Sequence, residues 1–513
     1  MENAKPIWAT RILLLLLAVA FGGCASVPLD YPKTPTAALT DTNDTTLARY
    51  SNTWRGDYPD GNGFYPLTEG IDAFGARLTM IDKAEKSIDA QYFMMKADSA
   101  GLVFCAELLE AADRGVRVRF LLDDIFTTVD DSALILLNEH PNIEMRIFNP
   151  IARKGVFVIN YLGHFRLANR RMHNKSFTVD NQVAVVGGRN IAEEYFQLDS
   201  TGEFIDFDML VTGPIVKEVS TEFDRYWNHE LAIPMNALYD KADPDEMADL
   251  RNRIKERMEE ERESVYGRAI NSNVIHGLAA GEIKPFPAEA RMIVDDPQKL
   301  LEDISDEQKV VATEIRKELL AATDEILIFT PYFIPGKRGM ETIREITANG
   351  VRVVILTNSL ATNNHTSVHS AYSSYRKRLL EAGVELWEAR GDAAEVINED
   401  GTKSFEQLTL HTKGIIIDRK HVFVGSLNLD PRSIDINTEM GIMISSADLG
   451  KYAAENSMAN MPTMAYQLKL DDNKISWHAT IDGQAVTETK EPLTTGWRRF
   501  QAWFLKIAPE KQL

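Results

Sequence analysis

The stretch "RMHNKSFTVDNQVAVVGGRN" (residues 171–190) recurs later in the chain as "TLHTKGIIIDRKHVFVGSLN" (residues 409–428). Both copies contain the pattern H-x-K-x4-D, then a short apolar run, then G-[GS]-x-N. Every matched position in the second copy lies 238 residues after its equivalent in the first, as the numbers 173 and 411 of the two histidines show. A single copy would be weak evidence, but two copies in register indicate a duplicated functional unit.

The repeated polar residues are suited to phosphodiester chemistry, which needs a nucleophile, a proton donor for the leaving alkoxide, and positive charge for the phosphoryl oxygens. In an extended H-x-K segment the histidine and lysine point to the same face. The two asparagines follow the next apolar run and can donate amide hydrogen bonds to the same oxygens. The candidate residues are His173, Lys175, Asp180 and Asn190 in the first copy, and His411, Lys413, Asp418 and Asn428 in the second. The sequence shows no cluster with metal-ligand spacing around them, so we expect neither a metal ion nor another cofactor.

Helical and strand patterns alternate on both sides of the motifs, which predicts an α/β fold. A first half over residues 67–235 and a second half over 311–460 repeat the same order of elements. We predict mixed, mostly parallel sheets flanked by helices, with the halves packed about a pseudo-twofold axis around one shared active site. Residues 236–310 interrupt the repeat and are predicted to form a charged helical connector.

The duplicated motif resembles that of the phospholipase D superfamily, over about residues 67–460. The phrases "GVRVRFLLDD" (115–124), "GGRNIAEEYF" (187–196) and "GSLNLDPRSIDINTEMG" (425–441) are similar to bacterial cardiolipin synthases of the C type. The resemblance implies a two-step reaction through a phosphohistidine, with His173 as nucleophile and His411 as acid and base, although near-symmetry leaves that order open. It also implies that Asp180 and Asp418 support the motifs structurally.

Members of the superfamily carry a carboxylate about thirty residues after each motif histidine, where it holds the imidazole in one tautomer and orientation. Asp206 and Glu439 occupy those places in this sequence, and Asp208 competes with Asp206 for the first.

The N-terminus has the pattern of a secretory signal peptide. Lys5 and Arg11 precede the apolar run "ILLLLLAVAF" (12–21), and small residues lead to Cys24. We predict a lipoprotein signal over residues 1–23 and lipidation of Cys24, with an uncleaved anchor and plain secretion as alternatives. The protein would then lie in the cell envelope, tethered to a membrane and facing the periplasm or the outside. Residues 24–66, rich in Pro, Thr, Asp and Asn, are predicted to form a flexible spacer.

The formal net charge of −20 argues against nucleic-acid binding, which usually requires a basic surface. The favoured function is phosphatidyl transfer onto an alcohol such as phosphatidylglycerol, which would give cardiolipin, with phosphatidylethanolamine as a second phospholipid substrate at the membrane surface. A hydrolase releasing phosphatidic acid is the alternative. A secreted nuclease and an inactive lipid-binding scaffold are further from the pattern, and an accessory protein is left open.

Residues 461–513 are predicted to form a hairpin turning at Asp482-Gly483, followed by an amphipathic helix. The helix carries apolar side chains at helical spacing, namely Trp497, Phe500, Trp503, Phe504 and Ile507. We expect it to dock on the protein core. Contact with a membrane interface is the alternative, because Arg498, Arg499 and Lys506 lie beside the aromatic rings.

Overall fold

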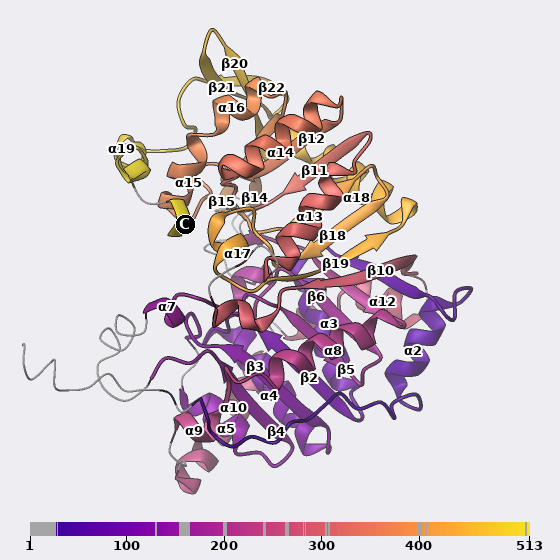
Figure 1. The fold of residues 1–513 in the computed structure, drawn as a ribbon. Helices are drawn as coiled ribbons and strands as arrows, with labels where there is room; N and C mark the ends of the chain where they lie inside the picture. The colour runs from indigo at the N-terminus through magenta and orange to yellow at the C-terminus, as the bar shows by residue number, and fades with distance from the viewer. Residues whose placement is uncertain are drawn as a thin grey trace, which may run out of the picture.

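The fold was analysed in a computed structural model. It describes residues 27, 29–128, 131–152, 165–198, 203–239, 243–261, 266–280, 282, 284–302, 305, 308–397, 403–406, 408–507 and 510–512. Two α/β halves lie one above the other, with the first half at the bottom of Figure 1 and the second at the top.

The first half is built around a mixed sheet in which β2, β3 and β4 are parallel. The two motif strands, β5 and β6, form a hairpin that pairs antiparallel with β2 on one side and with β8 on the other. In spatial order the strands are β1 (Asn62–Leu67), β8 (Asp208–Thr212), β6 (Val183–Gly187), β5 (Ser176–Val179), β2 (Ser87–Tyr92), β3 (Arg117–Asp123), β4 (Ile143–Phe148) and β9 (Ala232–Pro234).

The second half repeats this order strand by strand. Its parallel strands are β11, β12 and β13, and its motif hairpin is β17–β18. The spatial order is β10 (Phe286–Val294), β19 (Met440–Ser445), β18 (His421–Gly425), β17 (Gly414–Ile417), β11 (Glu325–Phe329), β12 (Arg352–Asn358), β13 (Glu385–Ala389) and β20 (Ala465–Asp471). The equivalent edge strands β1 and β10 pair antiparallel, with Phe64 opposite Phe286, and join the two sheets.

Helices cover both faces of each sheet. One face of the first sheet is covered by α3 (Gly70–Asp82), α4 (Ser99–Asp113) and α5 (Asp131–Asn138), and one face of the second by α13 (Val310–Leu320) and α14 (Gly336–Ala348). The helices α8 (Ile215–Trp227) and α18 (Ala447–Met464) pack into a third core, which the two halves share. This shared core contains Trp227 from the first half and Ile442 and Ala454 from the second, so burial of apolar surface joins the halves.

The predicted mixed α/β architecture in two repeated halves is confirmed. Fewer strand pairs are parallel than the helix–strand alternation predicted. Among the described residues, isolated bridges apart, parallel strand pairs occur only among three strands of each main sheet and in one short pair between the halves. The motif strands are joined by tight hairpins instead of helical crossovers, and a tight hairpin always gives antiparallel pairing.

The prediction of a flexible spacer over residues 24–66 is wrong for most of its length. The segment forms α2 (Thr46–Arg55) and contributes β1 to the sheet. Before α2, it supplies backbone acceptors to buried guanidinium groups: Arg119 bonds the carbonyl of Thr36, and Arg146 that of Thr34. Buried cations require such partners, and they fix this stretch against the first half although it carries little apolar periodicity.

The connector over residues 236–310 is only partly helical. Its helix α10 (Pro244–Glu261) is charged but packs on α4, with Ile254 and Met258 buried. Its later part forms β10, which belongs to the sheet because it pairs antiparallel with both β1 and β19. Beyond residue 460 the chain forms a three-stranded meander, β20, β21 (Lys474–Ile481) and β22 (Gln484–Glu488), and the helix α19 (Gly496–Phe504).

The motif aspartates Asp180 and Asp418 lie in the turns of the two hairpins and have positive φ angles of 50° and 51°. The Asp180 carboxylate accepts hydrogen bonds from the backbone N–H groups of residues 85, 86 and 87 at the start of β2. Asp418 accepts the equivalent three, from residues 323, 324 and 325, at the start of β11. Each aspartate therefore clamps its motif hairpin to the neighbouring parallel strand.

We expect Asp180→Ala to lower the free energy of unfolding by about 3 kcal/mol, because three backbone donors lose their acceptor and desolvation of an unpaired donor costs about 1–3 kcal/mol. Asp418→Ala should cost less, because most of its bonds are exposed to solvent. Urea denaturation followed by circular dichroism measures both. Asp482→Ala is the matched control, since Asp482 has the same left-handed φ of 50°. If Asp180→Ala were inactive but as stable as the wild type, Asp180 would not act by holding the motif hairpin against β2.

Candidate active site

The H-x-K segments leave their own sheets and bond to the opposite half. Met172 forms a parallel bridge with Thr438, and the His173 N–H donates to the Thr438 carbonyl at 3.0 Å. In the second half, β16 (Leu408–Leu410) pairs parallel with β7 (Glu203–Ile205), and the His411 N–H donates to the Ile205 carbonyl at 2.8 Å. The histidines and lysines thus precede the regular motif strands, at the seam between the halves.

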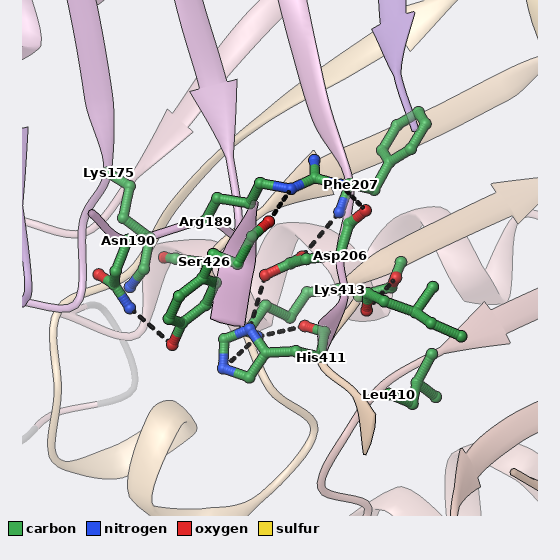
Figure 2. Close-up of polar contacts among 12 residues, drawn as sticks. Lys175, Arg189, Asn190, Asp206, Phe207, Leu410, His411, Lys413 and Ser426 are labelled. Atoms are coloured by element: carbon green, nitrogen blue, oxygen red, sulfur yellow. Dashed lines mark hydrogen bonds and ion pairs between the residues drawn. The ribbon is translucent and has the colours of Figure 1, made fainter. Parts of the chain in front are cut away.

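Each imidazole is held by a carboxylate of the other half. His173 Nδ1 lies 2.9 Å from Glu439 Oε2, and His411 Nδ1 lies 2.6 Å from Asp206 Oδ2 (Figure 2 draws the second pair). Asp206 and Glu439 are 2% and 0% exposed, so each carboxylate has almost no contact with water. A carboxylate at Nδ1 accepts a hydrogen bond from the Nδ1–H group, which fixes that tautomer and leaves Nε2 for chemistry.

The second residue of the G-[GS]-x-N pattern differs between the halves: it is Gly188 in the first and Ser426 in the second. A Cβ at Gly188 would lie 2.2 Å from Asp206 Oδ1, so only glycine leaves room for that carboxylate. The equivalent residue in the second half is Ser426, whose hydroxyl donates to Glu439 Oε2 and whose carbonyl lies 3.1 Å from His173 Nδ1. This position therefore shapes the carboxylate site in both halves. In the first half the missing side chain makes room for Asp206, and in the second half the serine hydroxyl binds Glu439.

The two lysines bring positive charge to the imidazoles. Lys175 Nζ donates to the carbonyl of His173 at 2.6 Å, and Lys413 Nζ lies 3.1 Å from Nε2 and 2.7 Å from Nδ1 of His411. Both lysines are 2% exposed. Burial lowers the pKa of Lys175 to about 7 and that of Lys413 to about 8, so the nearby carboxylates only partly compensate.

The imidazoles are held in their neutral form. Burial is the main cause, and the two lysines add to it: the pKa of His173 lies well below its ordinary value, and that of His411 is lowered to about 3. Both lysines act on each imidazole, so the two motifs form one electrostatic cluster. A neutral imidazole with its Nδ1 proton held by a carboxylate has a free electron pair on Nε2, which is the form that can attack phosphorus.

The two carboxylates differ in charge. Burial raises the pKa of Glu439 to about 7 against the opposing effect of Lys175. Burial also acts on Asp206, but Lys413 and His411 outweigh it and the pKa of Asp206 is lowered. Near neutral pH, Asp206 is therefore ionised while Glu439 is close to half-protonated, so the nearly symmetric site is electrostatically unequal.

Both motif asparagines are buried. Asn190 Nδ2 donates to Tyr195 Oη at 2.9 Å, which leaves its second amide hydrogen for another acceptor. The side-chain oxygens of Asn190 and Asn428 have no hydrogen-bond partner among the residues that the structure describes. The second amide hydrogen of Asn190 is the group that can be donated to an anionic ligand such as a phosphodiester.

Some residues considered from the sequence lie elsewhere. Asp208 pairs with Arg77 at 2.9 Å and is not a histidine partner. Asp180 and Asp418, which the motif pattern grouped with the catalytic residues, lie seven residues beyond their histidines, about 20 Å along an extended chain. Their clamping contacts explain why the motif ends in aspartate. Cys24 lies outside the described residues.

Aromatic residues around the imidazoles were not identified from the sequence. Phe93 meets His173 edge-to-face at 4.8 Å, Tyr195 meets His411 in the same way at 5.0 Å, and Phe204 stacks on His411 at 5.2 Å. These rings restrict the space for water around both Nδ1 contacts and lower the local dielectric constant. Aromatic residues close to the motifs in sequence, such as Tyr195, were the available signal.

Among the described residues, no group of three or more His, Cys, Asp or Glu side chains is arranged to hold a metal ion. In the same part of the chain, no helix is both long and apolar enough to cross a membrane.

Known proteins share this sequence over most of its length. Cardiolipin synthase C of Escherichia coli (strain K12) is 36% identical over 463 residues, which cover 89% of this chain and 97% of that protein. An uncharacterized protein of Helicobacter pylori (strain J99) is 31% identical over 512 residues, covering 98% of this chain and all of its own. The solved structure of phosphatidylserine synthase from Haemophilus influenzae Rd KW20 shares the fold, with a TM-score of 0.53 and 14% identity over 84% of this chain and 92% of its own.

The sequence pattern of the family described as "Cardiolipin synthase, PLD-like domain" matches twice, over residues 78–227 and 315–458. These ranges are the two structural halves, and each contains one motif histidine and one of the carboxylates. The chain belongs to the cardiolipin synthase family of the phospholipase D superfamily.

Proposed function

We propose that the protein is a phosphatidyltransferase that moves a phosphatidyl group from a donor phospholipid onto an alcohol acceptor, with cardiolipin as the product when the acceptor is phosphatidylglycerol. The observation that carries this proposal is the crossed pair of histidine–carboxylate contacts beside two buried lysines. A phosphodiester placed between the imidazoles would meet a nucleophile, a proton carrier and two cationic groups.

The reaction takes two steps. In the first, Nε2 of one histidine attacks phosphorus, the bond from phosphorus to the head-group oxygen breaks, and the second histidine gives its proton to that oxygen. In the second, the acceptor hydroxyl gives its proton to the same histidine and attacks phosphorus, and the phosphorus–nitrogen bond breaks. Both histidines return to their starting states, and the protonated lysines balance the charge of the phosphoryl oxygens throughout.

The unequal carboxylates support His173 as nucleophile and His411 as acid and base. An imidazolium forms more readily beside an ionised carboxylate, and the pKa of Asp206, the partner of His411, is lowered. The partner of His173 is Glu439, whose pKa is raised to about 7, so Glu439 stabilises a proton-carrying imidazole less well than Asp206 does. Binding of an anionic phosphodiester raises the pKa of His411, so it can carry the proton that the leaving group needs.

The family relationship supports phospholipids as substrates, and phosphatidylglycerol and phosphatidylethanolamine are the acceptor and donor that we propose. The proposed site of action is the membrane surface in the cell envelope, with Cys24 as the lipidated anchor, which the sequence pattern supports. If water takes the place of the acceptor alcohol, the same residues release phosphatidic acid, so hydrolysis is the competing activity.

The first test follows lipid products by mass spectrometry. Purified protein mixed with phosphatidylethanolamine and phosphatidylglycerol vesicles in EDTA should form cardiolipin, because the residues in place supply all the charge and proton transfer that the reaction needs. His411→Ala should lower the rate by about 10³-fold or more, as loss of a general acid–base group typically does. Formation of phosphatidic acid without cardiolipin would show that the protein is a hydrolase. Equal turnover by the wild type and by His411→Ala would show that His411 is not a catalytic residue.

A second test identifies the nucleophile. A phosphodiester with a p-nitrophenyl leaving group needs no protonation, so His411→Ala should release one equivalent of nitrophenolate and then stall as a covalent adduct on His173. His173→Ala should release none. Peptide mass spectrometry under alkaline conditions, which preserve phosphohistidine, locates the adduct. An adduct on His411 in the His173→Ala protein would reverse the assignment.

The pH dependence of kcat/KM tests the lysines. Because the pKa values of Lys175 and Lys413 are about 7 and about 8 in the empty site, both lose their charge as pH rises through this range, and kcat/KM should fall. Lys175→Arg should reduce the rate but move the alkaline decline upward by about one pH unit or more, since arginine stays protonated. A profile that is flat from about pH 6 to about pH 9 would contradict the role of the lysines.

A further inference from the structure

The C-terminal helix α19 turns its apolar side chains away from the protein. Trp497, Phe500, Trp503 and Phe504 are 66%, 48%, 65% and 54% exposed, and Ile507 in the turn that follows is 78% exposed. Together with Leu493 they form what we term the aromatic patch. The sequence predicted that this helix would dock its apolar face on the core, and the exposure of these residues shows that this prediction is wrong.

The inner face of α19 makes polar contacts instead. The carbonyl of the buried Ala502 accepts a hydrogen bond from the Ser370 hydroxyl, and Arg498 donates to the carbonyl of Asn363 at 2.8 Å. On the outer face the rings contact one another, with Phe500 5.5 Å from Trp497 and 5.9 Å from Trp503. The patch is therefore continuous and fixed in orientation, and its exposure is a property of the fold.

The aromatic patch is connected to the active site through β12 and the loop that follows it. Asn358, at the end of β12, bonds both the N–H and the carbonyl of Leu410, the residue before His411. The loop that follows β12 carries Asn363, to which Arg498 of α19 is bonded. In Figure 1, α19 projects from the side of the molecule opposite α2.

The first half adds an exposed aromatic residue close to the same site. Phe126 follows β3, is 52% exposed, and contacts Phe93 at 5.5 Å between ring centres. Phe93 in turn contacts His173. One exposed ring of the first half, Phe126, is thus separated from the His173 imidazole by a single side chain.

The charge of this region is opposite to that of the whole chain. Residues 493–507 contain Arg498, Arg499 and Lys506 and no acidic residue, which gives +3, while the chain as a whole carries −20. Tryptophan and phenylalanine beside basic residues are the composition of segments that lie in the membrane interface. Anionic phospholipid attracts this local positive charge, and its acyl chains can take up the exposed rings.

We propose that α19 and the adjoining residues of the aromatic patch insert into the interface of a bilayer that contains anionic phospholipid, and thereby hold the active site at the lipid surface. This deepens the proposed function, because it states how the substrate reaches the site. It does not depend on the N-terminal segment.

Insertion is tested directly by fluorescence quenching. The full-length protein is mixed with vesicles of phosphatidylglycerol and phosphatidylcholine, with and without brominated acyl chains. The brominated lipid should quench the fluorescence of Trp497 and Trp503. This quenched part of the fluorescence should be missing in the double variant Trp497→Phe/Trp503→Phe, in which the patch remains apolar. No difference in quenching between the variant and the wild type would overturn the proposal, whether or not the protein has enzymatic activity.

The functional consequence is tested with Trp497→Ser/Trp503→Ser. Its turnover of lipid in vesicles should fall about tenfold or more, because two interfacial anchors are lost. Its turnover of dihexanoyl phosphatidylglycerol below the micelle concentration should stay within about twofold, because the catalytic groups are untouched. Tyr58→Ser/Tyr452→Ser is the matched control, since both tyrosines are exposed, at 55% and 44%, outside the patch.

The outcomes separate the two proposals. Equal losses on vesicles and on soluble lipid would show that α19 is structural and overturn the docking proposal. Unchanged vesicle turnover in the serine variant, or a dimer in solution that this variant dissociates, would overturn it as well, the latter in favour of self-association. If neither lipid is turned over by the wild type, the proposed function fails, while the quenching result still decides whether α19 docks.

Discussion

The hydrogen bond between each motif histidine and a carboxylate of the opposite half is the contact on which the rest of the site depends. His173 is oriented by Glu439 and His411 by Asp206, so neither half contains a complete catalytic unit. A buried carboxylate is costly unless it is paired, and these two meet their imidazoles only when the halves are joined. The pairing of β1 with β10, the shared core around α8 and α18, and the backbone bridges at Thr438 and Ile205 all hold the halves in that register.

Small differences between the repeats turn a symmetric scaffold into an unequal active site. Asp206 fits because Gly188 leaves space for it, whereas the longer Glu439 lies against Ser426 and receives its hydroxyl hydrogen. The result is one carboxylate with a lowered pKa and one with a pKa raised to about 7. Such inequality favours one assignment of the nucleophile and the proton carrier over the reverse assignment.

The repeat made much of the fold predictable from the sequence. The constant offset between the copies identified equivalent strands, and the structure extends it to positions outside the motif: the bridge from Met95 to Ile191 recurs between Phe333 and Leu429. The offset also explains why Asp180 and Asp418 make the same three backbone contacts. Local periodicity and an internal repeat are properties of the sequence itself, so they could be recognised without any three-dimensional information.

Contacts between the halves could not be predicted in the same way. Asp206 and Glu439 lie about thirty residues after the histidine of their own half, yet each bonds the other half's histidine, 205 and 266 residues away. Thr34 and Thr36 are held by hydrogen bonds from buried arginines to their carbonyls, and such contacts leave no apolar pattern in the sequence. The helical spacing of Trp497 and Phe500 predicted an apolar face but not its direction, because periodicity does not distinguish a face that contacts the core from one that contacts lipid.

The environment of the imidazoles bears on whether the covalent intermediate is passed to an alcohol or to water. Phe93, Tyr195 and Phe204 surround the rings, and the catalytic side chains are almost fully buried, so water has little space beside them. With the aromatic patch seated in a bilayer, lipid would lie close to the loop that follows β12, the strand whose Asn358 holds the residue before His411. The acceptor that arrives from that side would be a phospholipid head group at high local concentration, and the lipid surface that delivers it would exclude water. Burial of the site and exposure of α19 would then have one consequence, which is to favour transfer over hydrolysis.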